Sequence, residues 1–148
     1  MGKVIAVVNQ KGGVGKTTTS INLAAALGMY GKKVLMIDLD SQGNATTGVG
    51  LDKRAIENSI YEVLTMKTSI ENAIVKTKSV NLSVIPAYLN LAGAEMELLE
   101  LEKRYKDTDM QFNRIMRLKD ELVKVRDKYD YIFSDIIICY IRSFFYCH

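Results

Sequence analysis

Positions 11–18 read KGGVGKTT and consist almost entirely of lysine, glycine and threonine. It follows an apolar run at positions 4–8 and precedes a segment with helical apolar spacing. A glycine-rich turn between a strand and a helix can aim its backbone N–H groups at an anion, and the helix dipole adds positive potential there. We therefore predict a phosphate-binding loop. Its nucleotide contacts would be Lys11, Gly12, Gly13, Val14, Gly15, Lys16, Thr17 and Thr18.

Two side chains in this loop have distinct predicted roles. Lys16 would place a compact positive charge beside the outer phosphates, and the Thr17 hydroxyl would ligate Mg²⁺. The strict form of the motif has glycine at position 10, where this chain has Gln10, and Lys11 adds a second lysine. The alternative is a glycine-rich turn with chance lysines, which the flanking strand and helix patterns disfavour.

Asp38 and Asp40 form the second group with chemical potential. They end an apolar run at 33–39, and their spacing of two puts both on one side of an extended chain. Doubly wound sheets place ligands at the carboxyl ends of their strands. A carboxylate there would hold the attacking water or the hydration shell of a metal ion. The alternative is a polar turn, because the following residues have turn composition.

The third group is an apolar strand that ends in an aspartate, at positions 129–135. Asp135 would bind Mg²⁺ through its water shell. This signal is weak by itself because many strands end in aspartate.

The apolar patterns predict an α/β fold with a mostly parallel sheet. We expect buried strands at 3–9, 33–39, 82–85 and 129–135. We expect helices at 17–30, 55–64, 69–75, 91–105 and 115–129. Thr108 and Gln111 form a candidate capping box for the last helix. A short coiled coil would share the pattern of the last two helices, although neither stretch sustains enough heptads.

The three motifs together resemble the ParA/Soj group of P-loop ATPases. KGGVGKTT matches the deviant Walker A motif of that group, DLDSQGNAT at 38–46 matches its second motif, and YDYIFSD at 129–135 matches its Walker B strand. Ser41 replaces the usual proline of the second motif. The resemblance implies a P-loop NTPase fold, a doubly wound and mostly parallel sheet.

The resemblance also implies roles for individual residues. Lys11 would reach across a dimer to the partner's phosphates, Lys16 would neutralise phosphate charge, and Asp40 would position the attacking water. Thr17 and Asp135 would serve the metal, with Asp38 as a supporting acid at the same metal site.

The implied function is Mg²⁺-dependent ATP hydrolysis that drives a dimer switch in chromosome or plasmid partitioning. The implied partners are a second copy, a centromere-binding ParB/Spo0J-like protein and, for the full-length family, non-specific DNA. The alternative is a nucleotide-binding module without turnover. Two other branches of the group are weaker alternatives. A MinD-like regulator should end in a basic amphipathic helix. An iron-protein-like electron carrier should have cysteine ligands in the body of the chain. Both cysteines lie after position 135.

Length and composition fit one soluble domain: 148 residues, 48% hydrophobic, 25% charged and a net charge of +3. No apolar run approaches the roughly 20 residues that span a membrane, so we expect a cytoplasmic protein. In the family this location extends to the nucleoid.

The resemblance covers residues 1–135 and stops at an apolar tail, 136–148. We expect a truncated family member that lacks the C-terminal part of the fold, with a tail from a frameshift or premature stop; a genuine short variant is the alternative. The resemblance also implies that strand 3–9 would then lie at a sheet edge, where it would promote association.

Overall fold

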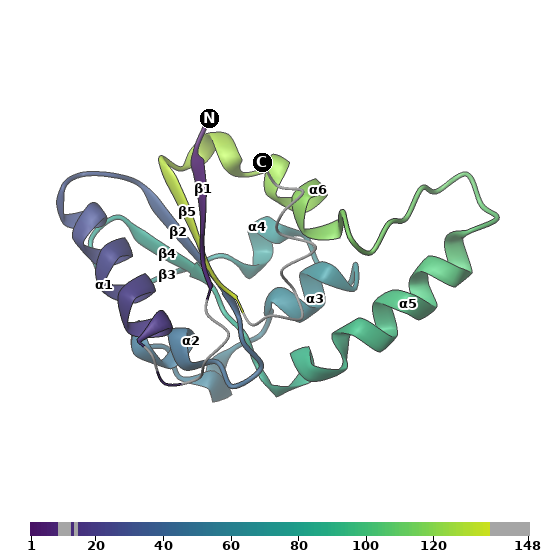
Figure 1. The fold of residues 1–148 in the computed structure, drawn as a ribbon, viewed down its shortest axis with the longest axis horizontal. Coiled ribbons are helices and arrows are strands. Elements are labelled where there is room, and N and C mark those ends of the chain that lie inside the picture. The colour runs from purple at the N-terminus through teal and green to yellow at the C-terminus, as the bar shows by residue number, and fades with distance from the viewer. Residues whose placement is uncertain (9–12, 14, 137–148) are drawn as a thin grey trace.

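The structure is a computed structural model that describes residues 1–8, 13 and 15–136. A five-stranded sheet with the order β1-β5-β2-β4-β3 forms its centre (Figure 1). The first four of these strands run parallel, and β3 pairs antiparallel with β4. The strands are β1 Lys3–Val7, β2 Val34–Leu39, β3 Val75–Lys76, β4 Leu82–Ile85 and β5 Tyr131–Ile136.

The strand β2 lies at the middle of the sheet, and all six of its residues are buried. Its uninterrupted apolar sequence suits a parallel strand that is covered on both faces. The strand β1 forms one edge of the described sheet and pairs only with β5 there. Val4 is buried, whereas Ile5 and the residues after it are only half-buried. The prediction of a buried strand at 3–9 was therefore wrong for most of its residues, whereas its expected place at a sheet edge agrees with the described strand order.

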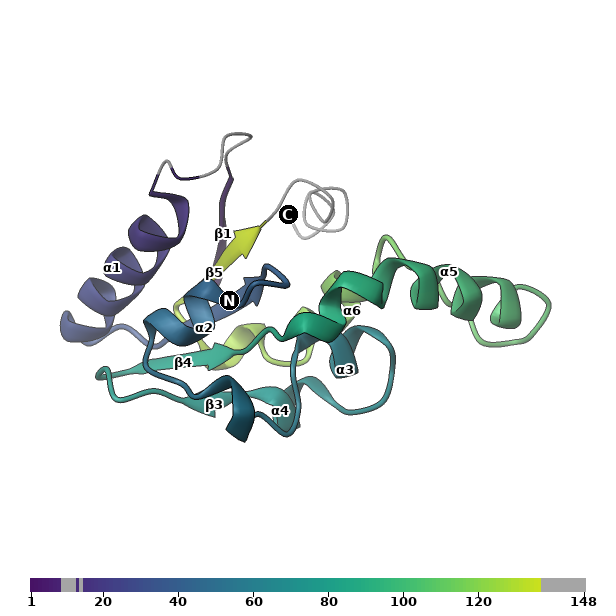
Figure 2. The same ribbon diagram turned by 90° about the horizontal axis from the view of Figure 1, so that it is seen from below.

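Helices cover both faces of the sheet and make three layers (Figure 1, Figure 2). One face packs against α1 (Lys16–Met29) and α2 (Asn44–Gly48), in a core that includes Ala24, Met36 and Phe133. The opposite face packs against a larger core centred on Leu35, Ile37 and Ile132. Its helices are α3 Ile60–Leu64, α4 Ile70–Ala73, α5 Ala94–Tyr105 and α6 Arg117–Val123. Because successive side chains of a strand point to opposite faces of the sheet, each residue of these strands faces one of the two cores.

The described part of the chain also contains three short 3₁₀ segments: Lys53–Ala55, Leu89–Gly93 and Arg126–Lys128. The helix α5 extends away from the body of the domain (Figure 2). None of the helices in the described ranges is long and apolar enough to cross a membrane.

The last predicted helix differs most from the structure. The pattern predicted a helix over 115–129, but α6 ends at Val123 and a 3₁₀ segment follows. Thr108 does not cap it: its hydroxyl donates to the carbonyl of Tyr105 and accepts the N–H of Met110. The capping box belongs instead to Ser59 and Glu62 at the start of α3. The strand β3 was missed because two residues give no usable periodicity.

Candidate nucleotide-binding site

Lys16 and Thr17 begin α1, directly after the described glycine Gly15. Gly15 has a φ of 84°, a left-handed conformation that side chains disfavour, so glycine permits the sharp entry into the helix. This entry places the first turn of α1 over the carboxyl end of β5. Lys16 is 14% exposed in its side chain, and Asp135 on β5 is fully buried. The fold therefore brings Lys16 and Thr17 of the predicted phosphate-binding loop together with Asp135 at the end of β5.

Asp135 accepts from both of these residues. The ammonium of Lys16 donates to its Oδ1, and the hydroxyl of Thr17 donates to its Oδ2 over 2.7 Å. A buried carboxylate needs such partners, because an unpaired charge inside a protein is strongly destabilising. The pairing defines one end of the site.

Asp38 lies beside Asp135 on the neighbouring strand, and the two are register partners. Asp38 is fully buried, and both of its oxygens accept hydrogen bonds. Oδ1 accepts the N–H of Asp40 over 3.0 Å, while Oδ2 accepts the N–H and the hydroxyl of Thr46 over 2.8 and 2.7 Å. Asp38 therefore anchors the turn that follows β2. Its predicted role at the metal stays a prediction.

The pKa of Asp38 is raised to about 6. Burial is the main cause, because it disfavours the charged form, and the nearby charge of Asp135 acts in the same direction. The hydrogen bonds from Thr46 and Asp40 oppose the rise, since they favour the carboxylate. The site therefore holds two adjacent acids of different character, Asp135 paired with a lysine and Asp38 paired only with neutral donors.

Asp40 lies just beyond the end of β2 and is half-buried. Its Oδ1 accepts the N–H of Gln42 over 2.9 Å, and its carbonyl accepts the N–H of Gly43 over 2.8 Å. The carbonyl of Gln42 also accepts a hydrogen bond from the ammonium of Lys53. These bonds close the turn without the proline that Ser41 replaces. Asp40 keeps an oxygen for which no hydrogen bond is described, so it can orient a water molecule.

The oxygen donors of this site fit a magnesium ion. Mg²⁺ is usually held by one or two carboxylates together with phosphate oxygens and water. Thr17 and Asp135 supply a hydroxyl and a carboxylate whose oxygens are 2.7 Å apart. The described ranges contain no cluster of three or more His, Cys, Asp or Glu side chains that would bind a metal unaided. Phosphate oxygens and water could complete the coordination of Mg²⁺ at this position.

Of the remaining residues of the predicted phosphate-binding loop, the structure describes Gly13 and Thr18. Gly13 has a φ of 73°, again a conformation that favours glycine, and Thr18 is exposed on the first turn of α1. Lys11, Gly12 and Val14 lie outside the described residues. Their predicted contacts, including the reach of Lys11 across a dimer, stay predictions.

Thr46 contributes to this site, although the sequence motifs did not predict it. Its hydroxyl donates to Asp38 and accepts the N–H of Ala87 over 2.9 Å, so it links β2 to the segment after β4. Thr46 is the last residue of the second motif, and this position was the available signal. Lys53 was also missed, because no local pattern connects it to the turn at Gln42.

Comparison with known proteins agrees with this geometry. A family model described as an AAA domain matches residues 2–138. The sporulation initiation inhibitor protein Soj of Bacillus subtilis is 47% identical over 135 residues, which are 91% of this chain and 49% of Soj. The chain thus spans about half the length of the curated relatives it matches.

Solved structures show the same likeness. The cobyrinic acid a,c-diamide synthase of Mycobacterium smegmatis, solved with an ATP analogue and magnesium, has a TM-score of 0.80 and is 38% identical. The match covers 91% of this chain and 51% of the synthase. A plasmid partition protein of Borrelia burgdorferi has a TM-score of 0.75 and is 29% identical, with 99% of this chain and 61% of that protein covered. With its glycine-rich entry into α1 and its buried aspartate on β5, the chain belongs to the ParA/Soj family of P-loop partition ATPases.

Proposed function

We propose that this chain binds ATP with Mg²⁺ and hydrolyses it as part of a nucleotide-driven switch in chromosome or plasmid partitioning. The observation that supports this proposal most is the convergence of Lys16 and Thr17 on Asp135. These are the residue types that contact phosphate and magnesium in P-loop proteins. The synthase structure with an ATP analogue and magnesium belongs to a protein of the same fold.

Each residue has a defined task in the proposed reaction. Lys16 would leave Asp135 and neutralise charge on the outer phosphates, while Thr17 and Asp135 would hold Mg²⁺. Asp40 orients the attacking water from its turn beyond β2. Asp38 keeps that turn in place through the backbone of Asp40. When bound, Mg²⁺ would neutralise negative charge that develops on the phosphates.

The proposed cycle includes further partners that follow from family membership. ATP would join two copies, with Lys11 of each reaching the other's phosphates. The dimer would bind DNA non-specifically and respond to a ParB/Spo0J-like protein in the cytoplasm, near the nucleoid. The second candidate is a nucleotide-binding module without turnover. It is favoured by the pairing of Lys16 with Asp135, because this pairing competes with contact between Lys16 and phosphate.

Phosphate release under steady-state conditions separates the two candidates. The unchanged chain should release phosphate from ATP only with Mg²⁺, and Asp40→Asn should lower this rate by about 10²-fold or more while ATP binding persists. Asparagine keeps an oxygen for the N–H of Gln42, so the turn should remain. Asp109→Asn, a change at an exposed aspartate after α5, is the matched control. Binding of ATP by the unchanged chain without any phosphate release would favour the module.

A further inference from the structure

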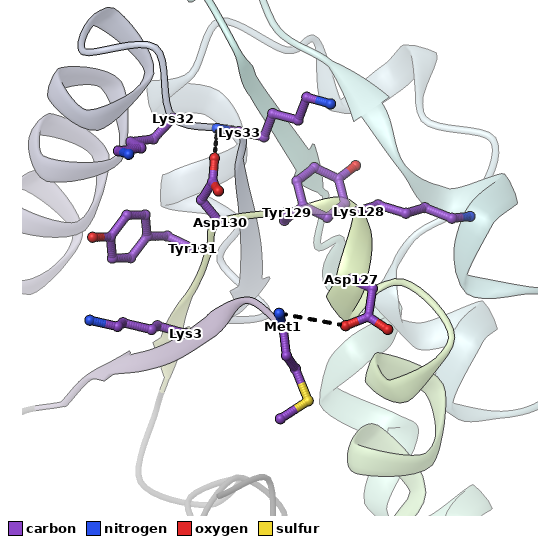
Figure 3. A pocket seen from close by; sticks show the side chains of 9 residues that line it. All are labelled: Met1, Lys3, Lys32, Lys33, Asp127, Lys128, Tyr129, Asp130 and Tyr131. Atoms are coloured by element: carbon purple, nitrogen blue, oxygen red, sulfur yellow. Dashed lines mark hydrogen bonds and ion pairs between the residues drawn. The ribbon is translucent and has the colours of Figure 1, made fainter.

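A pocket of about 410 Å³ lies at the amino-terminal ends of β1, β5 and β2, opposite the end that holds Asp135. Figure 3 shows the side chains that line it. Tyr131 is the first residue of β5 and Asp135 the fifth. At about 3.3 Å per residue, the two ends of this strand segment are roughly 13 Å apart. The pocket is therefore separate from the candidate nucleotide site.

Positive charge dominates this pocket. Its lining includes four lysines and the amino group of Met1, against two aspartates. Asp127 lies 3.8 Å from the amino group of Met1, whereas Asp130 keeps its negative charge, because the partner described for it is the neutral backbone N–H of Lys33 at 2.8 Å. Among the described residues, Lys3, Lys32 and Lys33 take part in no ion pair. An anion would find charge here that the protein does not neutralise itself.

Three side chains on one side of the pocket are arranged to share a ligand. Figure 3 shows the ring of Tyr131 between the side chains of Lys32 and Lys3, all extending in the same direction. Lys3 comes from β1, Tyr131 from β5, and Lys32 from the turn between α1 and β2. The ring of Tyr131 packs against the core beneath α1, which fixes the position of its hydroxyl. Two ammonium groups and a hydroxyl are a suitable donor set for phosphate oxygens.

We propose that this pocket binds a phosphate-bearing small molecule with at least two negative charges, held by Lys3, Lys32 and the hydroxyl of Tyr131. The volume lies within the usual range of small-molecule sites. The carboxylates of Asp127 and Asp130 interrupt the positive surface, and this disfavours a long polyanion such as nucleic acid. Both lysines are exposed, so binding should weaken as salt concentration rises.

The reactivity of individual lysines tests this proposal directly. Dilute protein is acetylated with and without sodium pyrophosphate, and the labelling of each lysine is followed by mass spectrometry. Pyrophosphate should slow labelling of Lys3 and Lys32 severalfold and in a saturable manner. Exposed Lys76 and Lys78, on and after β3, are internal controls and should not change. Lys16 reports separately on the nucleotide site in the same sample.

Substitutions of single side chains test which of them donate hydrogen bonds to the bound pyrophosphate. Lys32→Gln should raise the pyrophosphate concentration for half-maximal protection of Lys3 by about three- to fivefold, the effect of one exposed charge. Tyr131→Phe should also raise it, since only the hydroxyl is removed. Lys78→Gln makes the same charge change elsewhere and should leave it unaltered.

Three results would overturn the proposal. Protection of Lys76 and Lys78 equal to that of Lys3 would indicate unspecific screening. Protection confined to Lys16 would place pyrophosphate at the nucleotide site alone. Protection of Lys3 and Lys32 by a thymidine decanucleotide at lower phosphate concentration than pyrophosphate would indicate a nucleic-acid surface. None of these results depends on whether the chain hydrolyses ATP.

Discussion

The ammonium of Lys16 is paired with the buried carboxylate of Asp135, although 119 positions separate the two residues in the chain. The lysine expected to contact phosphate and the acid expected to serve the metal thus neutralise each other. Thr17 completes the arrangement through the second oxygen of Asp135. In the proposed function, nucleotide binding would require that Lys16 exchange one anionic partner for another.

This exchange predicts the behaviour of Asp135→Asn. Removal of the carboxylate charge frees Lys16, so a fluorescent ATP analogue should bind more tightly than to the unchanged chain when Mg²⁺ is removed by a chelator. The increase of affinity that Mg²⁺ gives to the unchanged chain should disappear. Asp120→Asn, at an exposed position on α6, is the matched control. Equal affinities of the unchanged chain and Asp135→Asn in chelator would show that the ion pair does not compete with nucleotide.

The raised pKa of Asp38 predicts how stability depends on pH. Its pKa is about 6 in the folded protein and 3.8 in the unfolded reference, so folding takes up a proton between these values. The contribution of Asp38 to stability is therefore greatest below about pH 4 and is lost as the pH rises to about 6. The change is of order 3 kcal/mol.

Urea unfolding of Asp38→Asn between pH 4 and pH 7 measures this contribution. Asparagine cannot ionise, so the stability of the unchanged chain minus that of the variant should fall as pH rises through this window. Asp52→Asn, at an exposed position before Lys53, is the control. A difference that stays constant from pH 4 to pH 7 would mean that Asp38 has an ordinary pKa.

Thr46→Val should destabilise the fold by about 1–3 kcal/mol, because it leaves the buried N–H of Ala87 without its acceptor. It should also raise the pKa of Asp38 further, since a hydrogen bond that stabilises the carboxylate is lost. Thr47→Val is the control, because Thr47 is exposed and its hydroxyl donates only to the carbonyl of Gly43. Chemical denaturation of both variants checks the difference. Equal losses of stability would contradict a special role for Thr46.

Much of this arrangement could be predicted from local sequence. The loop at 11–18, the acids at 38 and 40 and the strand ending at Asp135 each have a motif, and a parallel sheet brings strand ends together. The pairing of Lys16 with Asp135 and the bridge from Thr46 to Ala87 could not be predicted. They depend on side-chain geometry between elements that are distant in sequence.

Some boundaries also required the structure. The apolar spacing over 115–129 continues past the end of α6 at Val123, since the following 3₁₀ segment and turn keep the same residues against the core. Val125 and Tyr129 contact the same core as the helix residues. Burial alone therefore produced a helix-like pattern where the backbone is not helical.

The edge of β1 that has no neighbour in the described sheet predicts concentration-dependent association of the isolated chain. Unpaired backbone groups along an apolar edge can pair with another molecule. Val8→Lys, which changes an exposed residue just after β1, should reduce the association measured by light scattering. Val123→Lys adds the same charge at an exposed position on α6 and should have little effect. A monodisperse, cooperatively melting monomer of the unchanged chain would contradict the prediction.

Binding of a fluorescent ATP analogue tests most directly whether Lys16 and Asp135 form a nucleotide site. The unchanged chain should bind in a Mg²⁺-dependent manner, and Lys16→Ala should weaken binding about 10- to 100-fold. Lys78→Ala, an exposed change elsewhere, should bind as the unchanged chain does. Melting curves of both variants show whether a loss reflects unfolding. Equal Mg²⁺-dependent binding by a folded Lys16→Ala variant, or no binding by the unchanged chain, would contradict the account.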